Sequence, residues 1–450
     1  MSAAPPPRSV EVADRVVATL FRRAEEIARL SLVPCGRGRD WTPVLDRVLA
    51  SRLGAFPVML AGLAAVLWVT VVGANHPSAV LAAVFSTVET WLDGAFASAG
   101  APAWLHGVLV QGVYRTVAWV VSVMLPPMAI FFPCFALLED LGYLPWVAFN
   151  LDALFKRVGA CGKQALTMSM GLGCNAAGVI ACRIIDSPRE RLVAVLTNSF
   201  TVCNGRFPTL IALATILTAR YGLPGVGSGL AATLVVVGVV LTGVSVTFGV
   251  SWLLTRTLLR GAPSFSVLEL PPFRWPRVVQ VLVRSALDRT LFVLARAVKV
   301  AAPAGALVWV LANVHVGGLS LVGRLAGWLD PVGRLVGLDG FILVAFILGL
   351  PANEIVLPLL LMGYLSAGTM VRPDSLGALG AILAANGWGP ATAVCFMLFS
   401  LLHWPCATTL LTVRAETKSA FWTAAAALIP TLVAFVVCGA VAGVARLAGV

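Results

Sequence analysis

Long continuous runs of apolar residues, rather than alternating apolar and polar positions, dominate the chain. The runs cover residues 56–73, 104–137, 164–184, 190–219, 228–258, 279–313, 341–365, 377–402 and 419–447. Most of them reach the roughly 20 residues that a helix needs to cross the hydrocarbon core of a bilayer. A transmembrane strand would show alternation instead. The pattern therefore predicts an all-α polytopic membrane protein with about eight to ten transmembrane or re-entrant helices.

The residues before the first run have a different pattern. VADRVVATLFRRAEEIARLSL (12–32) places apolar residues at helical spacing, with Arg and Glu between them. This spacing is typical of an amphipathic helix that lies on the membrane surface or packs against a partner. A solvated helix leading into the membrane is an equal alternative. No compact apolar core with a cleavage site is present at the start, so we expect no signal peptide.

Composition and charge agree with a membrane protein and suggest its orientation. The chain is 59% hydrophobic and 12% charged, whereas a soluble domain carries about 25% charged residues. The net charge of +12 comes mostly from Arg residues that gather before the first run and in the loop RGAPSFSVLELPPFRWPR (260–277). The positive-inside bias places both regions in the cytoplasm. We expect a multi-pass protein of the inner membrane with a cytoplasmic N-terminus, and no nucleic-acid partner.

The same Arg-rich loop divides the membrane part into halves. We expect a cytoplasmic amphipathic segment (1–55), a first membrane half (56–258), a Pro- and Arg-rich cytoplasmic linker (259–278) and a second membrane half (279–450). This organisation predicts that the two halves are related to one another.

An internal repeat relates the two halves. A shift of 178 residues places LDALFKRVGACGKQALTMSMGLGCN (151–175) over LDPVGRLVGLDGFILVAFILGLPAN (329–353) without a gap. The matches include Leu151 with Leu329, Asp152 with Asp330, Gly159 with Gly337, Gly162 with Gly340, Gly171 with Gly349 and Asn175 with Asn353. Paired segments interrupted by Gly or Pro in two halves of a membrane protein indicate a transport site.

Four interrupted segments carry polar residues into apolar surroundings. GLGCN (171–175) and VCNGRFP (202–208) lie in the first half, and GLPANE (349–354) and HWPCATT (403–409) lie in the second. Unwound backbone in a membrane is tolerated where it lines a cavity, and a carboxylate there is a functional candidate. The candidate transport-path residues are Cys174, Asn175, Cys203, Asn204, Asn353, Glu354 and Cys406, with Arg206, His403 and Thr408 as supporting residues.

These side chains suggest a metal. Thiolate, imidazole, amide and carboxylate donors together suit a borderline transition metal such as Fe²⁺ better than Mg²⁺ or Ca²⁺. A membrane cysteine can instead be a small apolar filler, and we favour that interpretation for Cys134, Cys161 and Cys438. The nine cysteines form an odd set in or beside apolar runs, which is not a disulfide framework.

Three polar positions also have structural interpretations. His403 is more typical of an interfacial residue than of a metal ligand. Arg206 either pairs with Glu354 or caps a helix end. The charged residues of DSPRER (186–191) are expected to form a solvated loop that sets the membrane topology.

No nucleotide-binding or catalytic motif is visible. GACGKQ (159–164) has the wrong spacing for a P-loop and lacks a Ser or Thr after Lys163. No Ser-His-Asp order, H-E-x-x-H or C-x-x-C occurs. We therefore expect a transporter rather than an enzyme, with no permanently bound cofactor and Fe²⁺ as its substrate.

Several stretches resemble the membrane domain of the FeoB family of ferrous iron transporters. They are LLEDLGYLPWVAFNLDALFKRVGACGK, GLGCNAAGVIACRIIDSPRERLVAVLTNSFTVCNGRFP, LELPPFRWPR and ATAVCFMLFSLLHWPCATTLLTVRAETKSAFW. The likeness runs from about Asp46 to the C-terminus, roughly nine tenths of the chain. The resemblance implies paired Gate (nucleoside-recognition) regions whose cysteines line an iron path. It thereby implicates Cys174, Cys203 and Cys406.

The sequence departs from the family pattern at several places. Ala177 and Ser199 stand where the family usually has prolines, and Asn353 stands where it has a lysine before Glu354. We expect the family's N-terminal G-protein domain to be absent. Either a separate small G protein or other cytoplasmic regulator supplies control, or the protein works without one, or it has taken another substrate.

The function expected from these observations is an inner-membrane permease for Fe²⁺ or a similar divalent metal. The alternatives are a permease for an organic solute such as a nucleoside, and a membrane scaffold or assembly protein that does not transport. The partners expected are membrane lipid, the metal substrate, the cytoplasmic regulator and further copies of the chain.

Overall fold

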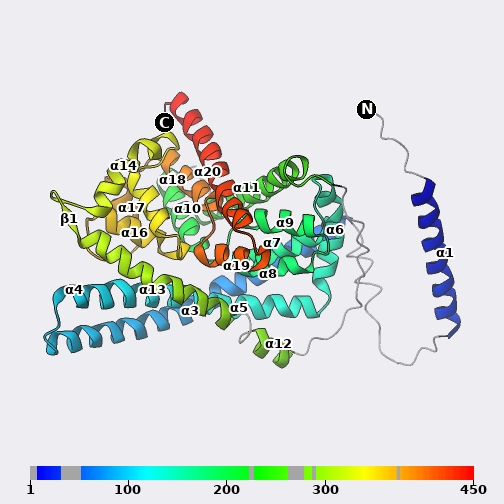
Figure 1. The fold of residues 1–450 in the computed structure, drawn as a ribbon, viewed down its shortest axis with the longest axis horizontal. Coiled ribbons are helices and arrows are strands. Elements are labelled where there is room, and N and C mark those ends of the chain that lie inside the picture. Colours follow the sequence, from blue (N-terminus) through cyan, green and yellow to red (C-terminus); the bar gives the residue numbers. More distant parts are fainter. Residues whose placement is uncertain are drawn as a thin grey trace. The chain divides into compact units, whose positions relative to one another are not determined.

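The computed structural model describes residues 8–31, 52–221, 228–261, 278–285, 290–371 and 375–449. Within these residues the chain is almost entirely helical (Figure 1). The linker expected at 259–278 falls largely outside the described residues, as do Cys35 and most of the expected N-terminal segment after residue 31. The contacts divide the chain into two units, residues 1–47 and 48–450.

The described residues of the first unit form an amphipathic helix, α1 (Arg8–Ser31). Its described apolar side chains, including Leu20, Phe21 and Ile27, are exposed. This agrees with the amphipathic helix predicted for residues 12–32.

The other described elements belong to the second unit. Its first part comprises α3 (Arg52–Ser98), α4 (Ala103–His106), the π-helix η1 (Gly107–Tyr114), α5 (Arg115–Asp140), α6 (Tyr143–Arg157), α7 (Lys163–Gly173), α8 (Asn175–Ala181), η2 (Cys182–Ile184), α9 (Pro188–Thr197), η3 (Asn198–Phe200), α10 (Phe207–Tyr221) and α11 (Ser228–Arg256). Its second part comprises α12 (Val278–Arg284), α13 (Phe292–Asn313), β1 (His315–Val316), β2 (Leu319–Ser320), α14 (Leu321–Leu335), α15 (Gly340–Leu348), η5 (Asn353–Ile355), α16 (Val356–Tyr364), α17 (Leu376–Ala385), α18 (Pro390–Leu402), α19 (Ala407–Thr417) and α20 (Ala420–Leu447). The two strands pair antiparallel, with His315 opposite Ser320.

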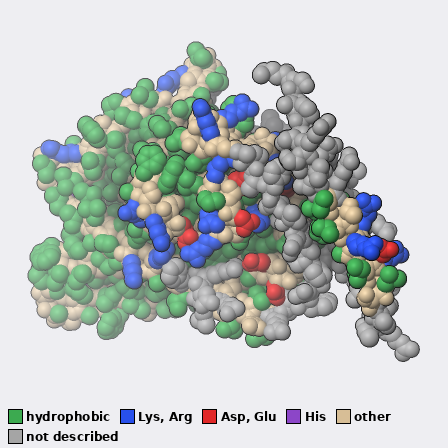
Figure 2. Space-filling view, turned by 45° about the vertical axis from the view of Figure 1, so that its right-hand side comes forward, with side chains coloured by type: hydrophobic (Ala, Val, Ile, Leu, Met, Phe, Trp, Pro, Cys, Tyr) green, Lys and Arg blue, Asp and Glu red, His purple; other side chains and the backbone are tan. Residues whose placement is uncertain are grey.

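The described residues confirm the prediction of an all-α polytopic membrane protein. Six helices are long and apolar enough to cross a membrane, and α14 with α15 makes a seventh span if this pair, bent by 109°, counts as one. Four shorter apolar helices accompany them, at Asn175–Ile184, Phe207–Tyr221, Asn353–Tyr364 and Leu376–Ala385. Hydrophobic side chains cover much of the surface in Figure 2, as expected for a surface that faces lipid.

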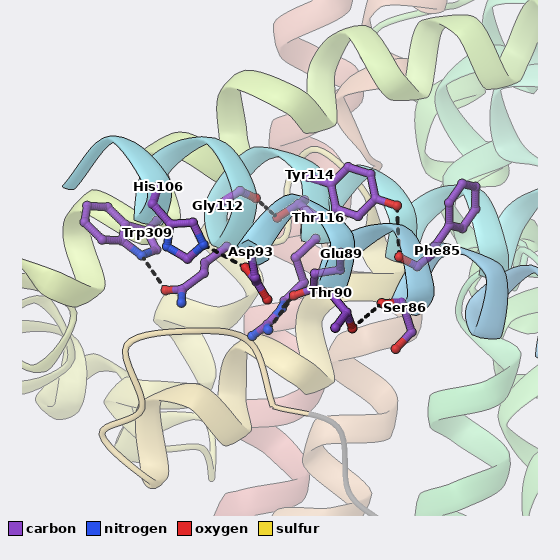
Figure 3. Close-up of polar contacts among 12 residues, drawn as sticks. Phe85, Ser86, Glu89, Thr90, Asp93, His106, Gly112, Tyr114, Thr116 and Trp309 are labelled. Carbon is purple, nitrogen blue, oxygen red and sulfur yellow. Dashed lines mark hydrogen bonds and ion pairs between the residues drawn. The ribbon is translucent and has the colours of Figure 1, made fainter. Parts of the chain in front are cut away.

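The first span is longer than the hydrophobic pattern predicts. The pattern ends that span at residue 73 and leaves 77–103 at the far interface, whereas α3 continues through Pro77 to Ser98. The polar residues that indicated an interface are paired with the neighbouring helix (Figure 3): Asp93 with His106 at 2.7 Å, and Glu89 with the Nε of Arg115 at 2.7 Å. Pairing across the hairpin allows charged residues to remain within a helix.

The internal repeat is visible in the backbone. α6 and α14 begin and end at positions separated by the same 178-residue shift. Each helix is followed by a glycine in the left-handed region, Gly159 with φ 77° and Gly337 with φ 75°. Because other residues rarely adopt this conformation, the matched glycines are required by the turn that both copies make.

A side-chain contact repeats as well. The Gly162 amide donates to Oδ1 of Asp152 at 2.8 Å, and the Gly340 amide donates to Oδ1 of Asp330 at 3.1 Å. Each aspartate also forms an ion pair with the residue four positions later, Lys156 or Arg334. The two Gate-type repeats predicted from the sequence are therefore present in the fold.

Candidate functional site

The first interruption separates α7 from α8. Cys174 is extended there, with φ −157° and ψ 126°, and its counterpart in the second half, Ala352, has φ −154° and ψ 122°. Gly173 is required because a Cβ on it would overlap the ring of Phe131. The helix thus breaks in the same way in both repeats, and only the first copy presents a thiol at the break.

Asn175 joins the first interruption to the second. In the amide orientation that satisfies both of its polar groups, its Nδ2 donates to the carbonyl oxygens of Gly171 at 3.1 Å and Thr201 at 3.3 Å. The Nδ2 of Asn198 in turn donates to the Asn175 carbonyl at 2.9 Å. These bonds satisfy backbone groups that the breaks leave without helical partners, as a buried site requires.

The second interruption lies between η3 and α10 and carries Cys203, Asn204 and Arg206. Arg206 is buried, and its Nη1 donates to the carbonyl oxygens of Ser199 at 3.3 Å and Leu401 at 2.8 Å. Leu401 belongs to the last turn of α18, so Arg206 caps a helix of the second half. Of the two alternatives for Arg206, the structure shows helix capping, and no ion pair with Glu354 is present among the described residues.

The third interruption lies between α15 and α16 and carries Asn353 and Glu354. Glu354 packs directly against Gly205 of the first half, and its carbonyl accepts a hydrogen bond from Nε1 of Trp119 at 3.3 Å. The Oδ1 of Asn353 is buried and has no hydrogen-bond partner among the described residues. An unpaired buried acceptor is costly, so a ligand or water at this oxygen would stabilise it.

The fourth interruption lies between α18 and α19. The Sγ of Cys406 lies 3.3 Å from Oγ1 of Thr409, whereas Oγ1 of Thr408 is buried without a partner. The Ala407 amide donates to the Leu350 carbonyl at 2.7 Å and so connects this interruption to the third. The two interruptions of each half are therefore joined to one another by hydrogen bonds.

His403 is not the interfacial residue that the sequence suggested. It is 1% exposed, and its Nδ1 lies 2.9 Å from the Phe399 carbonyl. Its ring packs against those of Phe346 and Phe399, and its Nε2 has no partner. The expectation was wrong because His403 follows an apolar helix that ends inside the protein rather than at the membrane surface.

All seven candidate path residues line one central cavity of about 30 Å³. They are Cys174, Asn175, Cys203, Asn204, Asn353, Glu354 and Cys406, and Thr408 lines it too. Arg206 and His403 do not line it. The volume is enough for one or two water-sized occupants. In the described part of the chain, no three His, Cys, Asp or Glu side chains are grouped closely enough to hold a metal ion.

Sequence reasoning missed part of the lining. Met124 and Met128 of α5 face the cavity, together with Val293 and Ala297 of α13. A methionine in an apolar helix looks like any other packing residue. The signal that could have found the first pair is Pro126-Pro127, which lies inside the helix between the two methionines.

Two consecutive candidate spans locate the fourth interruption along the chain's membrane-crossing helices. The first consists of α18 and α19 and covers Pro390–Thr417, and the second is α20. With a rise of about 1.5 Å per residue, each is long enough to cross the hydrocarbon core. The interruption at residues 403–406 falls near the middle of the first span.

Two further cavities lie at opposite ends of these spans. The wide vestibule, of about 760 Å³, is lined by Ala415 and Glu416 at the end of α19 and by Val293, which also lines the central cavity. The small vestibule, of about 360 Å³, is lined by Ala391 at the start of α18 and Arg446 at the end of α20. The small vestibule shares no lining residue with the central cavity.

Aromatic rings lie between the small vestibule and the fourth interruption. Trp388 lines that vestibule, and its ring packs on Phe396 at 5.2 Å. Phe346 then contacts Phe396 at 5.0 Å and His403 at 4.7 Å. These rings form a buried aromatic cluster that runs from the small vestibule to His403, just before Cys406 of the fourth interruption.

The charged segment 186–191 is not a solvated loop throughout. Glu190 is 2% exposed and lies in α9, and Arg189 donates to the carbonyl oxygens of Leu259 and Gly159. Asp186 is exposed, and the Lys163 ammonium lowers the pKa of its carboxyl. The segment is ordered because its arginines satisfy carbonyl groups at the ends of neighbouring elements.

Comparisons with known proteins agree with this architecture. The Gate (Nucleoside recognition) model matches residues 121–217 and 294–420, and the model of the ferrous iron transport protein B C terminus matches 236–287. Together they match more than half of the chain. No solved structure matches.

The curated relatives carry the same name in distant organisms. The Fe(2+) transporter FeoB of Synechocystis sp. is 28% identical over 416 residues, which cover 91% of this chain and 64% of the relative. The Staphylococcus aureus protein of that name is 26% identical over 411 residues, or 87% of this chain and 57% of the relative. The chain thus spans less than two thirds of the length of these relatives. From the two Gate segments, the C-terminal segment and these relatives, we conclude that the chain belongs to the FeoB family.

Proposed function

We propose that the chain is an inner-membrane permease that moves ferrous iron, or a similar divalent metal, through the central cavity. One observation carries the proposal: four helix interruptions, two from each half, bring Cys, Asn and Glu side chains to a single small cavity. Interrupted helices that meet between two repeats are the arrangement expected of a transporter binding site.

The donor set suits a metal that must be released again. Thiols, an amide oxygen and a carboxylate together favour a borderline cation. Because no three strong ligands are grouped among the described residues, a metal would meet few of them at once. Weak, successive contacts allow passage, whereas a complete ligand cage would trap the ion.

The vestibules support an alternating-access mechanism. We infer that the wide vestibule is cytoplasmic. Arg189 donates to the carbonyl oxygen of Leu259, beside the Arg-bearing end of α11, and to that of Gly159. Gly159 is close in sequence to Lys163, which lines the wide vestibule. The positive-inside bias assigns the Arg-bearing end of α11 to the cytoplasm. The aromatic cluster would then separate the central cavity from the small vestibule on the outer side of the membrane. The chain would expose the cavity to the outside when the two repeats rearrange.

The size of the cavity disfavours an organic solute. Sites for drug-sized molecules have volumes of roughly 300–1,000 Å³, whereas the central cavity holds about 30 Å³. The wide vestibule could admit a nucleoside, but its residues are not those of the four interruptions. A metal is therefore the better substrate for the central cavity.

The test is uptake of radioactive ferrous iron by a host that lacks its own iron transporters. We expect expression of the chain to raise uptake above the vector control, and Glu354→Ala to abolish the increase without removing the protein from the membrane. Absence of uptake, with the protein shown to be in the membrane, would contradict the proposal. A change in complex formation without a change in flux would favour a scaffold.

A further inference from the structure

Two methionines of α5 belong to the central cavity. Met124 and Met128 line it together with Cys174, Cys203 and Cys406, so five sulfur-bearing side chains surround about 30 Å³. Residues four positions apart in a helix lie on the same face, which explains how α5 presents both thioethers to the same space. Met128 is 2% exposed and Met124 is partly buried.

Two prolines lie inside α5 between these side chains, and the helix continues through them. Pro126 and Pro127 lie between the methionines and lack the amide hydrogen that would bind the carbonyl oxygens of Ser122 and Val123. In a membrane such carbonyl groups need another partner. The α5 wall thus combines thioether sulfur with carbonyl groups that the two prolines leave without their helical donors.

Thioethers complement thiols as donors for a metal in transit. A cysteine must lose its proton to bind a metal, whereas a thioether binds without a proton change and adds no charge. Neutral, weak donors increase the number of contacts without creating a trap, which matters where no three His, Cys, Asp or Glu side chains of the described residues are grouped.

We propose that the thioethers of Met124 and Met128 are metal donors of the transport path and set its preference for soft and borderline cations over hard ones. The proposal rests on the proposed function of the central cavity. Sulfur ligands select such cations, while carboxylate, carbonyl and water ligands suit Mg²⁺, Ca²⁺ and Mn²⁺. If the methionines only fill space, as they do in many cores, a soft diamagnetic ion will not shift their methyl signals by coordination.

Methionine methyl NMR tests the proposal without requiring transport. The purified full chain contains nine methionines, which can be labelled with ¹³C at the methyl group and assigned with Met124→Leu, Met128→Leu and Met362→Leu. Fe²⁺ is paramagnetic and should broaden the Met124 and Met128 signals, which reports a metal close to them, whereas coordination is reported by a diamagnetic ion. Ag⁺, a soft diamagnetic ion, should shift them, and Mg²⁺ should not. Met362 of α16 is buried outside the cavity lining, and its signal should stay unchanged.

A thiol-labelling experiment on the same samples separates this proposal from the function on which it rests. If Fe²⁺ protects Cys174 or Cys203 from labelling but Ag⁺ shifts neither methionine signal, the thioether role is wrong and the metal path stands. If Fe²⁺ affects neither the cysteines nor the methionines, both proposals fail.

Competition during uptake tests the selectivity. In the wild-type chain, Cd²⁺ should inhibit Fe²⁺ uptake at much lower concentrations than Mn²⁺ does. The double variant Met124→Leu/Met128→Leu keeps the side-chain volume nearly constant. It should reduce the ratio of the inhibitory Mn²⁺ concentration to the inhibitory Cd²⁺ concentration by about tenfold. Met362→Leu is the matched control and should leave the ratio unchanged. An unchanged ratio in the double variant would overturn the selectivity role.

Discussion

The carboxylate of Glu354 lies directly against the backbone of Gly205, and this contact joins the two halves of the chain. A Cβ placed on Gly205 would overlap Oε1 of Glu354 and lie 2.5 Å from its Cδ. Glu354, the one acidic side chain among the described residues that line the cavity, is therefore seated on a residue without a side chain. Both residues line the central cavity, so the position of the acid depends on a glycine more than a hundred residues earlier.

Replacing this glycine should displace the acid. We expect Gly205→Ala to reduce iron flux by about tenfold or more, because overpacking a filled site forces side chains to move at a cost of roughly 1–3 kcal/mol. Uptake of radioactive Fe²⁺ by cells with matched protein levels measures the effect. Gly249→Ala in α11, where nothing lies within 4 Å of the added Cβ, is the control. Equal uptake by the two variants would show that the seat of Glu354 does not matter.

The cavity cysteines should differ from the buried ones elsewhere. We expect Cys174→Ser and Cys203→Ser each to reduce iron flux strongly while the chain still folds and inserts, because a hydroxyl is a harder and far less acidic donor than a thiol. Cys438→Ser should have little effect. The Sγ of Cys438 lies 3.5 Å from the Cys395 carbonyl, which can accept a hydrogen bond from the new hydroxyl.

Thiol labelling provides a second measurement on the same residues. A small water-soluble reagent should modify Cys174 or Cys203, and added Fe²⁺ should slow the modification. Normal transport by all three serine variants, with no labelling of either cavity cysteine, would leave the interruptions as packing features only.

The sequence alone was sufficient to find the polar part of the cavity. Gly171, Gly173 and Pro351 interrupt apolar runs, and Cys174, Asn175 and Asn353 follow at once. Such residues are rare inside membrane helices because burying them is costly, so their positions are informative. The 178-residue shift also predicted that the first and third interruptions are equivalent, which their backbone angles confirm.

Other features could not be predicted from the sequence, for physical reasons. Met124 and Met128 are apolar and carry no pattern that distinguishes cavity from core. Glu190 and Asp93 are charged, which normally indicates solvent, but in the folded chain Glu190 is buried and Asp93 is paired with His106. Whether a charge is paired depends on which helices become neighbours, and that information is not local in the sequence.

The repeated aspartates should contribute equally to stability. Asp152 and Asp330 each accept a hydrogen bond from a glycine amide ten residues later. We expect Asp152→Ala and Asp330→Ala each to lower the free energy of unfolding by about 1–3 kcal/mol, since the amide would lose its charged partner. Unfolding in mixed micelles measures both. Asp186→Ala is the control, because the Asp186 carboxyl is exposed and forms an ion pair with Lys163. A several-fold difference between the losses caused by Asp152→Ala and Asp330→Ala would contradict the equivalence of the repeats.

The ion pair at the wide vestibule should affect stability little. The Arg183 guanidinium contacts Glu416 with two hydrogen bonds, Nε to Oε2 at 2.8 Å and Nη2 to Oε1 at 2.6 Å. Because Arg183 is well exposed, we expect the coupling to be about 1 kcal/mol or less, as measured by a double-mutant cycle with Arg183→Gln and Glu416→Gln. A coupling that stays unchanged at high salt would argue against an exposed pair, because ions screen such contacts.

Removing the buried arginine should be far more damaging. The Arg206 guanidinium donates to the carbonyl oxygens of Ser199 and Leu401, and at 3.4 Å to that of Trp404. We expect Arg206→Met to lower the free energy of unfolding by about 2–4 kcal/mol, because it removes charged donors and leaves buried acceptors at the end of α18 without a partner. Arg206→Lys should recover less than half of this loss, since an ammonium cannot reproduce the planar fork. Arg220→Met, at an exposed arginine beside Tyr221, is the control. If Arg206→Met unfolds like the wild-type chain in mixed micelles, the two halves are held together without this residue.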